Sequence, residues 1–515
     1  MPSLDAGTVR WLLAAGVLAG IAASTGCGQP PSEPVASGLL IRDARVVDGT
    51  GAPERLASVR VAGDRIAAIG ALAPLPGETV VEADGLVLAP GFVDTHSHYD
   101  DGLLAAPQAL AAVSQGITTV VVGQDGLSHH PLADWFAALE AAPPAVNVAS
   151  YSGHGTLRER VLGGDYRRHA TEAEVTAMRA LLRADLDAGA LGLATGLEYD
   201  PGLQSSTEEV VALAREAAVA GGRYISHLRS EDRFFWEAVD EIVRIGREAA
   251  VPVQISHLKL AMRSLWGEAD RLLARLEEVR AAGVEVTADV YPYEYWQSSM
   301  TVLFPERDFT DLEEARFVLR ELAAPENVLL GRFEPDPALV GRTLAAIAAE
   351  RGTEPARALL DLIAESGAGE RAESIIATSM ATEDVARLLE WEHANVCTDG
   401  ELDGRHPRGF GAFPRVLAWL VREEGRLGLE EAIRRMTSLA ADHVGLAGRG
   451  RLVAGAPADL VLLDPATVVD RATPEDPQRP AEGIRTVWVA GRKVYDGGAP
   501  TGERPGRVLR RGATP

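Results

Sequence analysis

Apolar, strand-like runs alternate with long helical segments through the middle of this 515-residue chain. The helical segments are rich in Ala, Leu, Arg and Glu, and this alternation predicts parallel βα units in which helices cover a sheet. A (β/α)8 barrel needs eight strands, whereas nine runs are candidates, so we expect one to lie outside the barrel. The candidates are residues 86–94, 116–123, 145–151, 190–196, 222–227, 251–257, 284–290, 374–379 and 394–399.

Both ends of the chain have a different pattern. Residues 39–90 contain short segments in which apolar and polar residues alternate, separated by Gly and Asp. Residues 445–500 show the same pattern, which indicates antiparallel strands. We therefore predict an α/β fold, with a TIM-like (β/α)8 barrel at residues 91–444 and a small β-sandwich domain built from both chain ends. Extra residues around 300–370 indicate an insertion near the barrel mouth, and residues 501–515 form a tail.

Residues 1–27 resemble a bacterial lipoprotein signal peptide. Arg10 precedes a 13-residue apolar run that is too short to span a bilayer, and the sequence STGCG follows, with the lipid-accepting cysteine at Cys27. Residues 28–38 would then be a flexible linker. We expect an exported, membrane-anchored lipoprotein on the periplasmic side of a bacterial envelope; a disordered apolar tail is the alternative.

The net charge of −24 disfavours nucleic acid and anionic membrane surfaces as partners, because both require a basic face. Only two cysteines occur, Cys27 and Cys397, so there is no disulfide framework. The sequence leaves the oligomeric state open.

Polar residues recur where the strand candidates end. In a parallel barrel these positions face the active site. One histidine there is more often a structural residue than a ligand, but several on separate strands favour a zinc site, which takes His and carboxylate ligands. In the His96-x-His98 pair both side chains point to the same side of a strand. The candidate ligands are His96, His98, Asp125, His227, His257 and Asp399.

An ordered set of motifs resembles the D-aminoacylase branch of the amidohydrolase superfamily, the N-acyl-D-amino-acid deacylases. The set includes LAPGFVDTHSHYD, GITTVVVGQDG, SHLRSE, QISHLK and HPRGFGAFPRVL, within residues 39–496. The resemblance implies a metal-dependent hydrolase barrel with one or two Zn²⁺ per chain. It also implies hydrolysis of the amide of N-acyl-D-amino acids, which releases a carboxylate and a D-amino acid.

The resemblance also implies roles for the ligands. His227 and His257 bind the tighter zinc, His96 and His98 with Asp399 form the adjacent position, and Asp399 is the general acid and base. Characterised relatives have a metal-binding cysteine where this chain has Asp125, in GQDG. Aspartate is a competent zinc ligand that could bridge two metals, and a turn residue is the alternative.

The α-carboxylate of an N-acyl amino acid needs a cation. Lys259 lies two residues beyond His257, on the same predicted face, and is one of two lysines in the chain. Tyr291, Ser298 and Ser299 could complete this carboxylate pocket. Arg229 and Arg408 could also act, although ion pairs with neighbouring acids are simpler. His154 and Tyr199 could face the reacting carbonyl or be structural.

Two other functions stay open. One is a related amidohydrolase acting on cyclic amides, similar to dihydropyrimidinase, or on dipeptides; the motif set favours the deacylase. The other is a non-catalytic scaffold on the same fold, which the complete set of candidate ligands disfavours.

Overall fold

The computed structural model describes residues 38–367 and 372–513, so the predicted signal peptide and Cys27 lie outside the described residues. Eight strands form the barrel. In chain order they are β6 (Phe92–Asp94), β7 (Ile117–Val122), β8 (Asn147–Ser150), β10 (Gly192–Gly196), β11 (Arg223–His227), β12 (Val253–Ile255), β13 (Val286–Val290) and β17 (Ala394–Val396). All neighbouring pairs are parallel, as the TIM-like prediction requires, and that fold is confirmed.

Two short links join these strands around the barrel. Strand β9 (Ser152–Gly153) follows β8 directly and pairs with β10. A parallel bridge between Ser97 and Gly400 connects the chain beyond β6 to the chain beyond β17. The carboxyl ends of β6 and β17 therefore lie side by side, although about 300 residues separate them in the sequence.

Amphipathic helices surround the barrel. α4 (Glu172–Ala188) begins with a capping box, in which Thr171 and Glu174 satisfy each other's backbone N–H groups. α6 (Phe235–Ala249) buries an apolar stripe that packs on β12. The other helices along the barrel are α1 (Leu110–Val113), α2 (Leu132–Ala141), α3 (His154–Leu162), α5 (Thr207–Val219), α7 (Ala269–Ala281), α11 (Thr382–Glu390), α12 (Arg408–Val416), α13 (Leu429–Met436) and α14 (Ser438–His443).

Both chain ends contribute to one nine-stranded sheet. Antiparallel pairing of β5 (Val87–Pro90) with β18 (Leu460–Leu463) joins the N-terminal strands to the C-terminal ones. Trp488 and Leu460 are buried in its core together with Ile41 and Val59. The remaining strands are β1 (Leu39–Val46), β2 (Arg55–Ala62), β3 (Arg65–Gly70), β4 (Thr79–Glu82), β19 (Ile484–Val489), β20 (Arg492–Asp496) and β21 (Ala499–Pro500).

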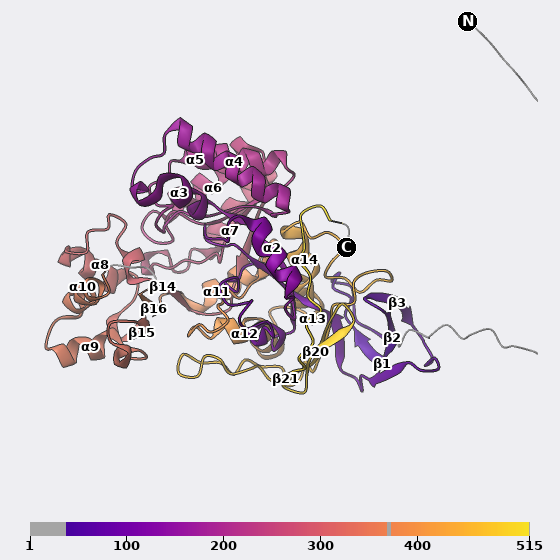
Figure 1. Cartoon of the computed structure of the whole chain (residues 1–515). Coiled ribbons are helices and arrows are strands. Elements are labelled where there is room, and N and C mark those ends of the chain that lie inside the picture. The colour runs from indigo at the N-terminus through magenta and orange to yellow at the C-terminus, as the bar shows by residue number, and fades with distance from the viewer. Residues whose placement is uncertain (1–37, 368–371, 514–515) are drawn as a thin grey trace, which may run out of the picture. The chain divides into compact units, whose positions relative to one another are not determined.

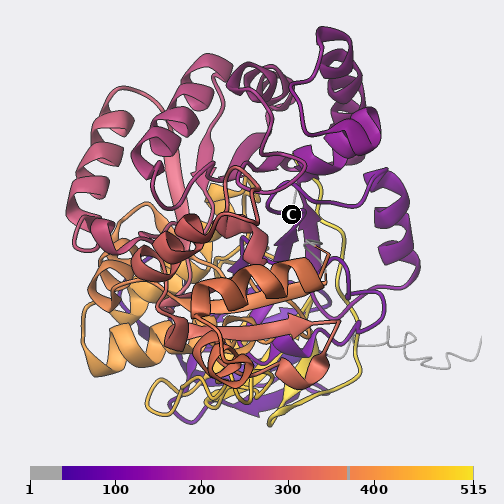
Figure 2. The ribbon, with the colours of Figure 1, turned by 90° about the vertical axis from the view of Figure 1, so that its left-hand side faces the viewer.

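The strand candidate at residues 374–379 lies outside the barrel. It forms β16 (Glu373–Thr378), the middle strand of an antiparallel sheet with β14 (Tyr295–Ser298) and β15 (Val328–Phe333). α8 (Leu312–Glu321), α9 (Leu344–Arg351) and α10 (Pro355–Glu365) complete this insertion. Seen from the left-hand side of Figure 1, the insertion lies in front of the barrel (Figure 2).

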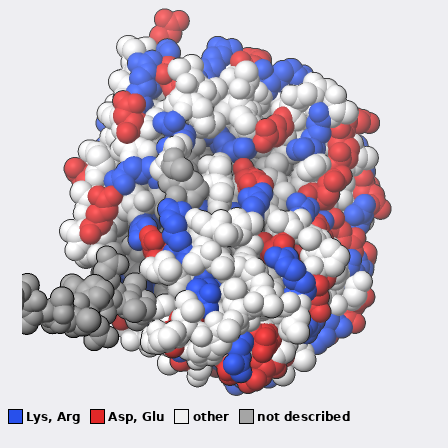
Figure 3. All heavy atoms as spheres, turned by 90° about the vertical axis from the view of Figure 1, so that its right-hand side faces the viewer, with Lys and Arg blue, Asp and Glu red and all other residues white. Residues whose placement is uncertain are grey.

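The C-terminal tail packs against the barrel, because Leu509 N donates to Val148 O and Val148 N donates to Arg507 O. The face shown in Figure 3 carries basic and acidic side chains interspersed. Among the described residues, no helix is both long enough and apolar enough to cross a membrane.

Candidate metal centre and substrate pocket

The loops that follow β6, β7, β12 and β17 bring four ligand groups together. His96 Nε2 lies 3.5 Å from Asp125 Oδ1 and 3.5 Å from Asp399 Oδ1. Ligand atoms of His96, Asp125, His257 and Asp399 all lie within 4.8 Å of one another. His98 joins this group, because its Nε2 lies 3.1 Å from Asp399 Oδ1 and 3.5 Å from Asp125 Oδ2.

A second group shares His257 with the first. His227 Nδ1 lies 2.9 Å from His257 Nε2, and ligand atoms of His227, Glu231 and His257 lie within 4.8 Å of one another. Asp125 belongs to the first group and also reaches the shared histidine: Oδ1 faces His96, whereas Oδ2 is 3.5 Å from both His98 Nε2 and His257 Nε2. The structure therefore brings all six sequence-predicted ligands together, and the two oxygens of Asp125 face different histidines.

Three residues of this centre have left-handed backbone conformations. The φ angles are 51° at Asp125, 35° at His257 and 48° at Asp399. Such conformations cost a non-glycine residue about 1–3 kcal/mol and are concentrated at functional sites. The backbone is thus strained at the residues whose side chains converge.

The residues fit a divalent metal. His96 is completely buried, and neither of its ring nitrogens has a hydrogen-bond partner within the described chain; Asp125 Oδ1 is also unpartnered. Buried polar atoms without partners are costly, so these atoms indicate a missing ligand. Imidazole nitrogens and carboxylate oxygens suit zinc, and the shared donors of the two groups suit one or two ions.

Carboxylates outside the predicted set position the histidines. Glu198 Oε2 lies 2.9 Å from His227 Nε2, and Glu231 Oε1 lies 3.1 Å from His257 Nδ1. Asp289 accepts a hydrogen bond of 2.6 Å from His257 N and lies 3.5 Å from His96 Nδ1. Carboxylates of this kind fix the tautomer and orientation of metal-binding histidines. Asp289 could have been found from the sequence as a charged residue within the apolar strand VTADV. Glu231 could have been found from its position in the motif SHLRSE.

The electrostatics of the centre favour metal binding and base catalysis. Burial lowers the pKa of His227 to about 4, so its ring is neutral, as a ligand must be. Burial opposes ionisation of Asp399, but Arg408 and the neighbouring histidines hold the pKa of that carboxyl well below its usual range. Burial raises the pKa of Asp94 to about 7; its carboxyl accepts hydrogen bonds from Thr398 N and Oγ1 and so ties β6 to the Asp399 loop.

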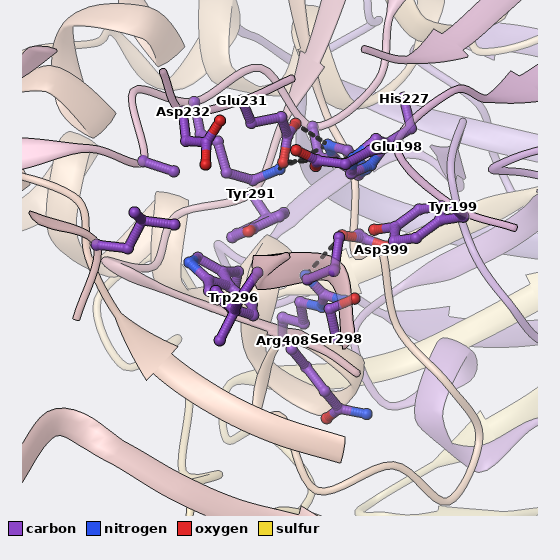
Figure 4. A pocket seen from close by; sticks show the side chains of 17 residues that line it. Glu198, Tyr199, His227, Glu231, Asp232, Tyr291, Trp296, Ser298, Asp399 and Arg408 are labelled. Atoms are coloured by element: carbon purple, nitrogen blue, oxygen red, sulfur yellow. Dashed lines mark hydrogen bonds and ion pairs between the residues drawn. The ribbon is translucent and has the colours of Figure 1, made fainter. Parts of the chain in front are cut away.

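A pocket of about 480 Å³, including the part open to solvent, leads to this centre (Figure 4). His96 and Asp125 lie outside its wall. Sequence-predicted residues in its wall are Tyr199, His227, His257, Lys259, Tyr291, Ser298, Asp399 and Arg408.

The two cations of this wall are both paired. Lys259 Nζ lies 2.5 Å from Glu231 Oε2 and 2.8 Å from His257 Nδ1, so it is not the free cation that the sequence suggested. Arg408 Nη1 lies 2.5 Å from Asp399 Oδ2, and the guanidinium sits over the ring of Tyr291. Arg408 Nε and the Tyr291 hydroxyl are buried and have no hydrogen-bond partner in the described chain.

Three predicted pocket residues lie elsewhere. His154 Nε2 is 2.8 Å from Glu209, which also binds Arg158, so this histidine is part of a buried ionic cluster behind the barrel mouth. Arg229 is paired with Glu241, as its simpler interpretation predicted. Ser299 shares a hydrogen bond with Thr301. None of the three lines the pocket.

Comparison with known proteins agrees with this arrangement. The sequence pattern of the amidohydrolase family matches residues 79–326 and 342–495. The chain belongs to the amidohydrolase family. This amidohydrolase is 39% identical to a D-aminoacylase of Alcaligenes xylosoxydans xylosoxydans, over 92% of the chain and 98% of that protein. It is also 39% identical to an N-acyl-D-aspartate deacylase of the same organism, over 92% of the chain and 95% of that protein.

A solved structure provides a further match. N-acyl-D-glutamate deacylase from Bordetella bronchiseptica, crystallised with zinc and a phosphonate mimic of the tetrahedral intermediate, is 36% identical. It superposes with a TM-score of 0.83 over 92% of the amidohydrolase and 99% of the solved chain. The resemblance to the D-aminoacylase branch is therefore confirmed.

Proposed function

We propose that this amidohydrolase uses zinc to hydrolyse the amide bond of N-acyl-D-amino acids, releasing a carboxylate and a D-amino acid. One observation carries the proposal: a pocket with two buried cations, Lys259 and Arg408, opens onto a metal-type centre at Asp399. Three similar proteins act on N-acyl-D-amino acids by their names, and one binds zinc.

Bound zinc would supply an activated water and polarise the scissile carbonyl. Asp399 is placed to accept the proton of that water and to donate it to the leaving nitrogen, because it lies at both the centre and the pocket wall. Its low pKa keeps it ionised at neutral pH, so it is ready to accept the proton.

Arg408 and Tyr291 are the groups best placed to bind the substrate carboxylate. Both line the pocket, and both present a buried donor, Arg408 Nε and the Tyr291 hydroxyl, that no described residue satisfies. A substrate carboxylate loses its water on entering the site, and these two donors can replace it. Ser298 lies in the same wall.

The rest of the pocket favours a neutral, apolar side chain on the amino acid. Its wall includes Trp296, Val302 and Leu322, together with the carboxyl group of Asp232. Within the described chain, Lys259 and Arg408 are the only Lys or Arg residues of this wall, and acids already pair with both. A second substrate carboxylate would meet apolar groups or Asp232, which is unfavourable.

The test of this side-chain preference compares N-acetyl-D-leucine with N-acetyl-D-glutamate. We expect a higher kcat/KM for the leucine compound, and Asp232→Asn should narrow the difference. Faster hydrolysis of the glutamate compound by the unchanged protein would contradict the proposed pocket chemistry.

A cyclic-amide hydrolase is the second candidate. Hydantoin and dihydropyrimidine rings carry no carboxylate, so they would leave the donors of Arg408 and Tyr291 unused. Assaying dihydrouracil and N-acetyl-D-leucine with the same zinc-loaded protein separates the two functions, and turnover of the linear compound alone is expected.

We also infer that the protein is exported and anchored to a bacterial membrane through lipid on Cys27. The support is the sequence of residues 1–27 alone. Expressed in a bacterium, the protein should fractionate with membranes, and Cys27→Ser should release it. A cytosolic protein that still carries residues 1–27 would contradict export.

A further inference from the structure

The loop after β7, which carries the ligand Asp125, packs against the first turn of α3. Thr156 N donates a hydrogen bond of 3.1 Å to Gly126 O, the carbonyl next to Asp125. The Thr156 hydroxyl accepts from Ser128 N at 3.0 Å and donates to Ser128 O at 3.1 Å. Gly153 N donates to Ser128 Oγ at 2.9 Å. Four hydrogen bonds therefore join the ligand-bearing loop to the start of α3.

The backbones around this loop are too close together to leave room for side chains. A Cβ atom added at Gly153 would lie 2.5 Å from Gly126 O, and one at Gly155 would lie 2.9 Å from the same oxygen. On the other side of the loop, a Cβ atom at Gly196 of β10 would lie 2.2 Å from Asp125 O. Only glycine permits so close an approach of two backbones. The loop is therefore held between α3 and β10.

These contacts hold Asp125 in an unfavourable backbone conformation. Its φ angle of 51° lies in the left-handed region, and Gly126, with a φ angle of 81°, follows it there. A non-glycine residue keeps such a conformation only where neighbouring groups impose it. The hydrogen bonds from α3 and the close contacts on both sides of the loop supply that constraint. The direction of the Asp125 carboxylate thus depends on where α3 begins.

The first turn of α3 is itself anchored by a buried ionic cluster. His154 and Arg158 lie four residues apart, so they point to the same side of the helix. His154 Nε2 lies 2.8 Å from Glu209 Oε1, and Arg158 Nη1 lies 2.6 Å from each carboxylate oxygen of Glu209. All three residues are buried, and Glu209 belongs to the first turn of α5. The cluster therefore ties the start of α3 to a second helix.

We propose that residues 153–158, the motif GHGTLR, position Asp125 for the metal ion. The two glycines and the threonine of the motif hold the Asp125 loop, while its histidine and arginine hold the helix. None of these six residues belongs to a ligand group of the described chain, so they are positioning residues that act on bound metal through Asp125. This inference rests on the metal centre and not on the proposed substrate.

The zinc affinities of four proteins test the proposal: the unchanged protein, Gly155→Ala, Asp125→Ala and the double variant. The methyl group added in Gly155→Ala pushes on Gly126 O. Zinc should then bind about 10–100-fold more weakly, the usual effect of disturbing a group that orients a metal ligand. In the Asp125→Ala background the same change should cause no further loss, because its effect passes through Asp125. Competition with a zinc chelator measures the affinities without any substrate.

Gly222→Ala is the matched control. A Cβ atom at Gly222, which precedes β11 at the opposite end of the barrel from the metal centre, would lie 2.9 Å from Leu191 O. This is the same distance to a carbonyl oxygen as at Gly155, but the zinc affinity should stay unchanged. If Gly155→Ala does not fold, Thr156→Val replaces it, because valine has a similar size and removes only the two hydroxyl bonds to Ser128.

Three results would overturn the proposal. In the first, Gly155→Ala, or Thr156→Val in its place, binds zinc as tightly as the unchanged protein. In the second, the loss is equal with and without Asp125, or also occurs in Gly222→Ala, which would indicate a general disturbance of the barrel. In the third, Asp125→Ala itself binds zinc normally, so that Asp125 is not a ligand. Because no substrate is involved, the proposed deacylase function stands or fails separately.

Discussion

The ammonium group of Lys259 lies 2.5 Å from a carboxylate oxygen of Glu231, and both groups contact His257. Lys259 is only 5% exposed, so the pair is largely removed from water. A buried charge whose partner is removed costs several kcal/mol. Lys259 therefore contacts His257 both directly and through Glu231, in addition to lining the pocket.

Lys259→Met should consequently impair more than substrate binding. We expect kcat/KM to fall by about 30-fold or more on both charged and neutral substrates, because about 2 kcal/mol or more is lost when one partner of such a pair is removed. Glu231→Gln in the Lys259→Met background should restore part of the activity, since it removes the unpaired charge. The kcat/KM and zinc content of the unchanged protein, Lys259→Met, Glu231→Gln and the double variant measure the coupling between the two residues. Additive losses would show that the two residues act independently.

Arg408→Gln should raise KM for N-acetyl-D-leucine strongly, with a loss of about 100-fold in kcat/KM if a 2–5 kcal/mol charge contact disappears. Arg408 also lowers the pKa of Asp399, so its removal should raise that pKa. The acid limb of the pH–rate profile should then move to higher pH, because Asp399 must be ionised to accept a proton. If the acid limb of the pH–rate profile does not move in Arg408→Gln, then Arg408 does not lower the pKa of the group that accepts the proton.

Asp399→Asn keeps the size of the side chain and removes its ability to take up a proton. The rate should fall by about two to four orders of magnitude, the usual effect of losing a general acid–base. Thermal unfolding of the variant serves as the control for folding. Near-normal turnover would identify another proton carrier.

Measurement of bound metal tests the metal centre independently of enzyme activity. After dialysis, the unchanged protein should retain one to two zinc ions per chain, as the two ligand groups allow. His227→Ala/His257→Ala should lose zinc, and Asp125→Ala should lower the stoichiometry because its two oxygens face different histidines. Full zinc in the histidine double variant would refute the ligand assignment.

His443 predicts how stability depends on pH. Its ring is buried against Asn395, which in turn bonds Thr95 below the metal centre, and burial lowers the pKa of His443 to about 3. Below pH 6.5, the ordinary value, the unfolded chain binds the proton and the folded chain does not, so stability should fall as the pH drops from 6.5 towards 3. One such group contributes at most about 1.4 kcal/mol per pH unit. Urea unfolding should show that the free energy of unfolding of His443→Gln depends less steeply on pH in this window. An unchanged pH dependence would show that His443 is not the group responsible.

Sequence patterns located the strand-end ligands because a parallel barrel places every such end at one mouth, whatever the loops do. His96, Asp125, His257 and Asp399 were all found in this way. The run at residues 374–379 looked like a barrel strand because an apolar run reads the same in a parallel barrel and in the antiparallel insertion sheet.

The ion pair of Lys259 could not be predicted from the sequence. Whether Lys259 meets Glu231 or a substrate depends on how two strand ends approach each other, and no spacing in the sequence encodes that distance. The same holds for Glu198, whose carboxylate faces His227 on the neighbouring strand, and for Asp289 on β13, whose carboxylate faces His96 in the loop after β6. His154 follows a strand, as the metal ligands do, but its ring contacts Glu209 instead of the metal centre.

The central claim is zinc-dependent cleavage of N-acyl-D-amino acids at the Asp399 centre. Its most direct test is release of leucine from N-acetyl-D-leucine and N-acetyl-L-leucine by the same protein, before and after removal and return of zinc. The account predicts that the D-compound is cleaved, that chelation abolishes cleavage and zinc restores it, and that the L-compound is a far poorer substrate. Absence of cleavage of the D-compound by fully zinc-loaded protein, or equal cleavage of both compounds, would contradict it.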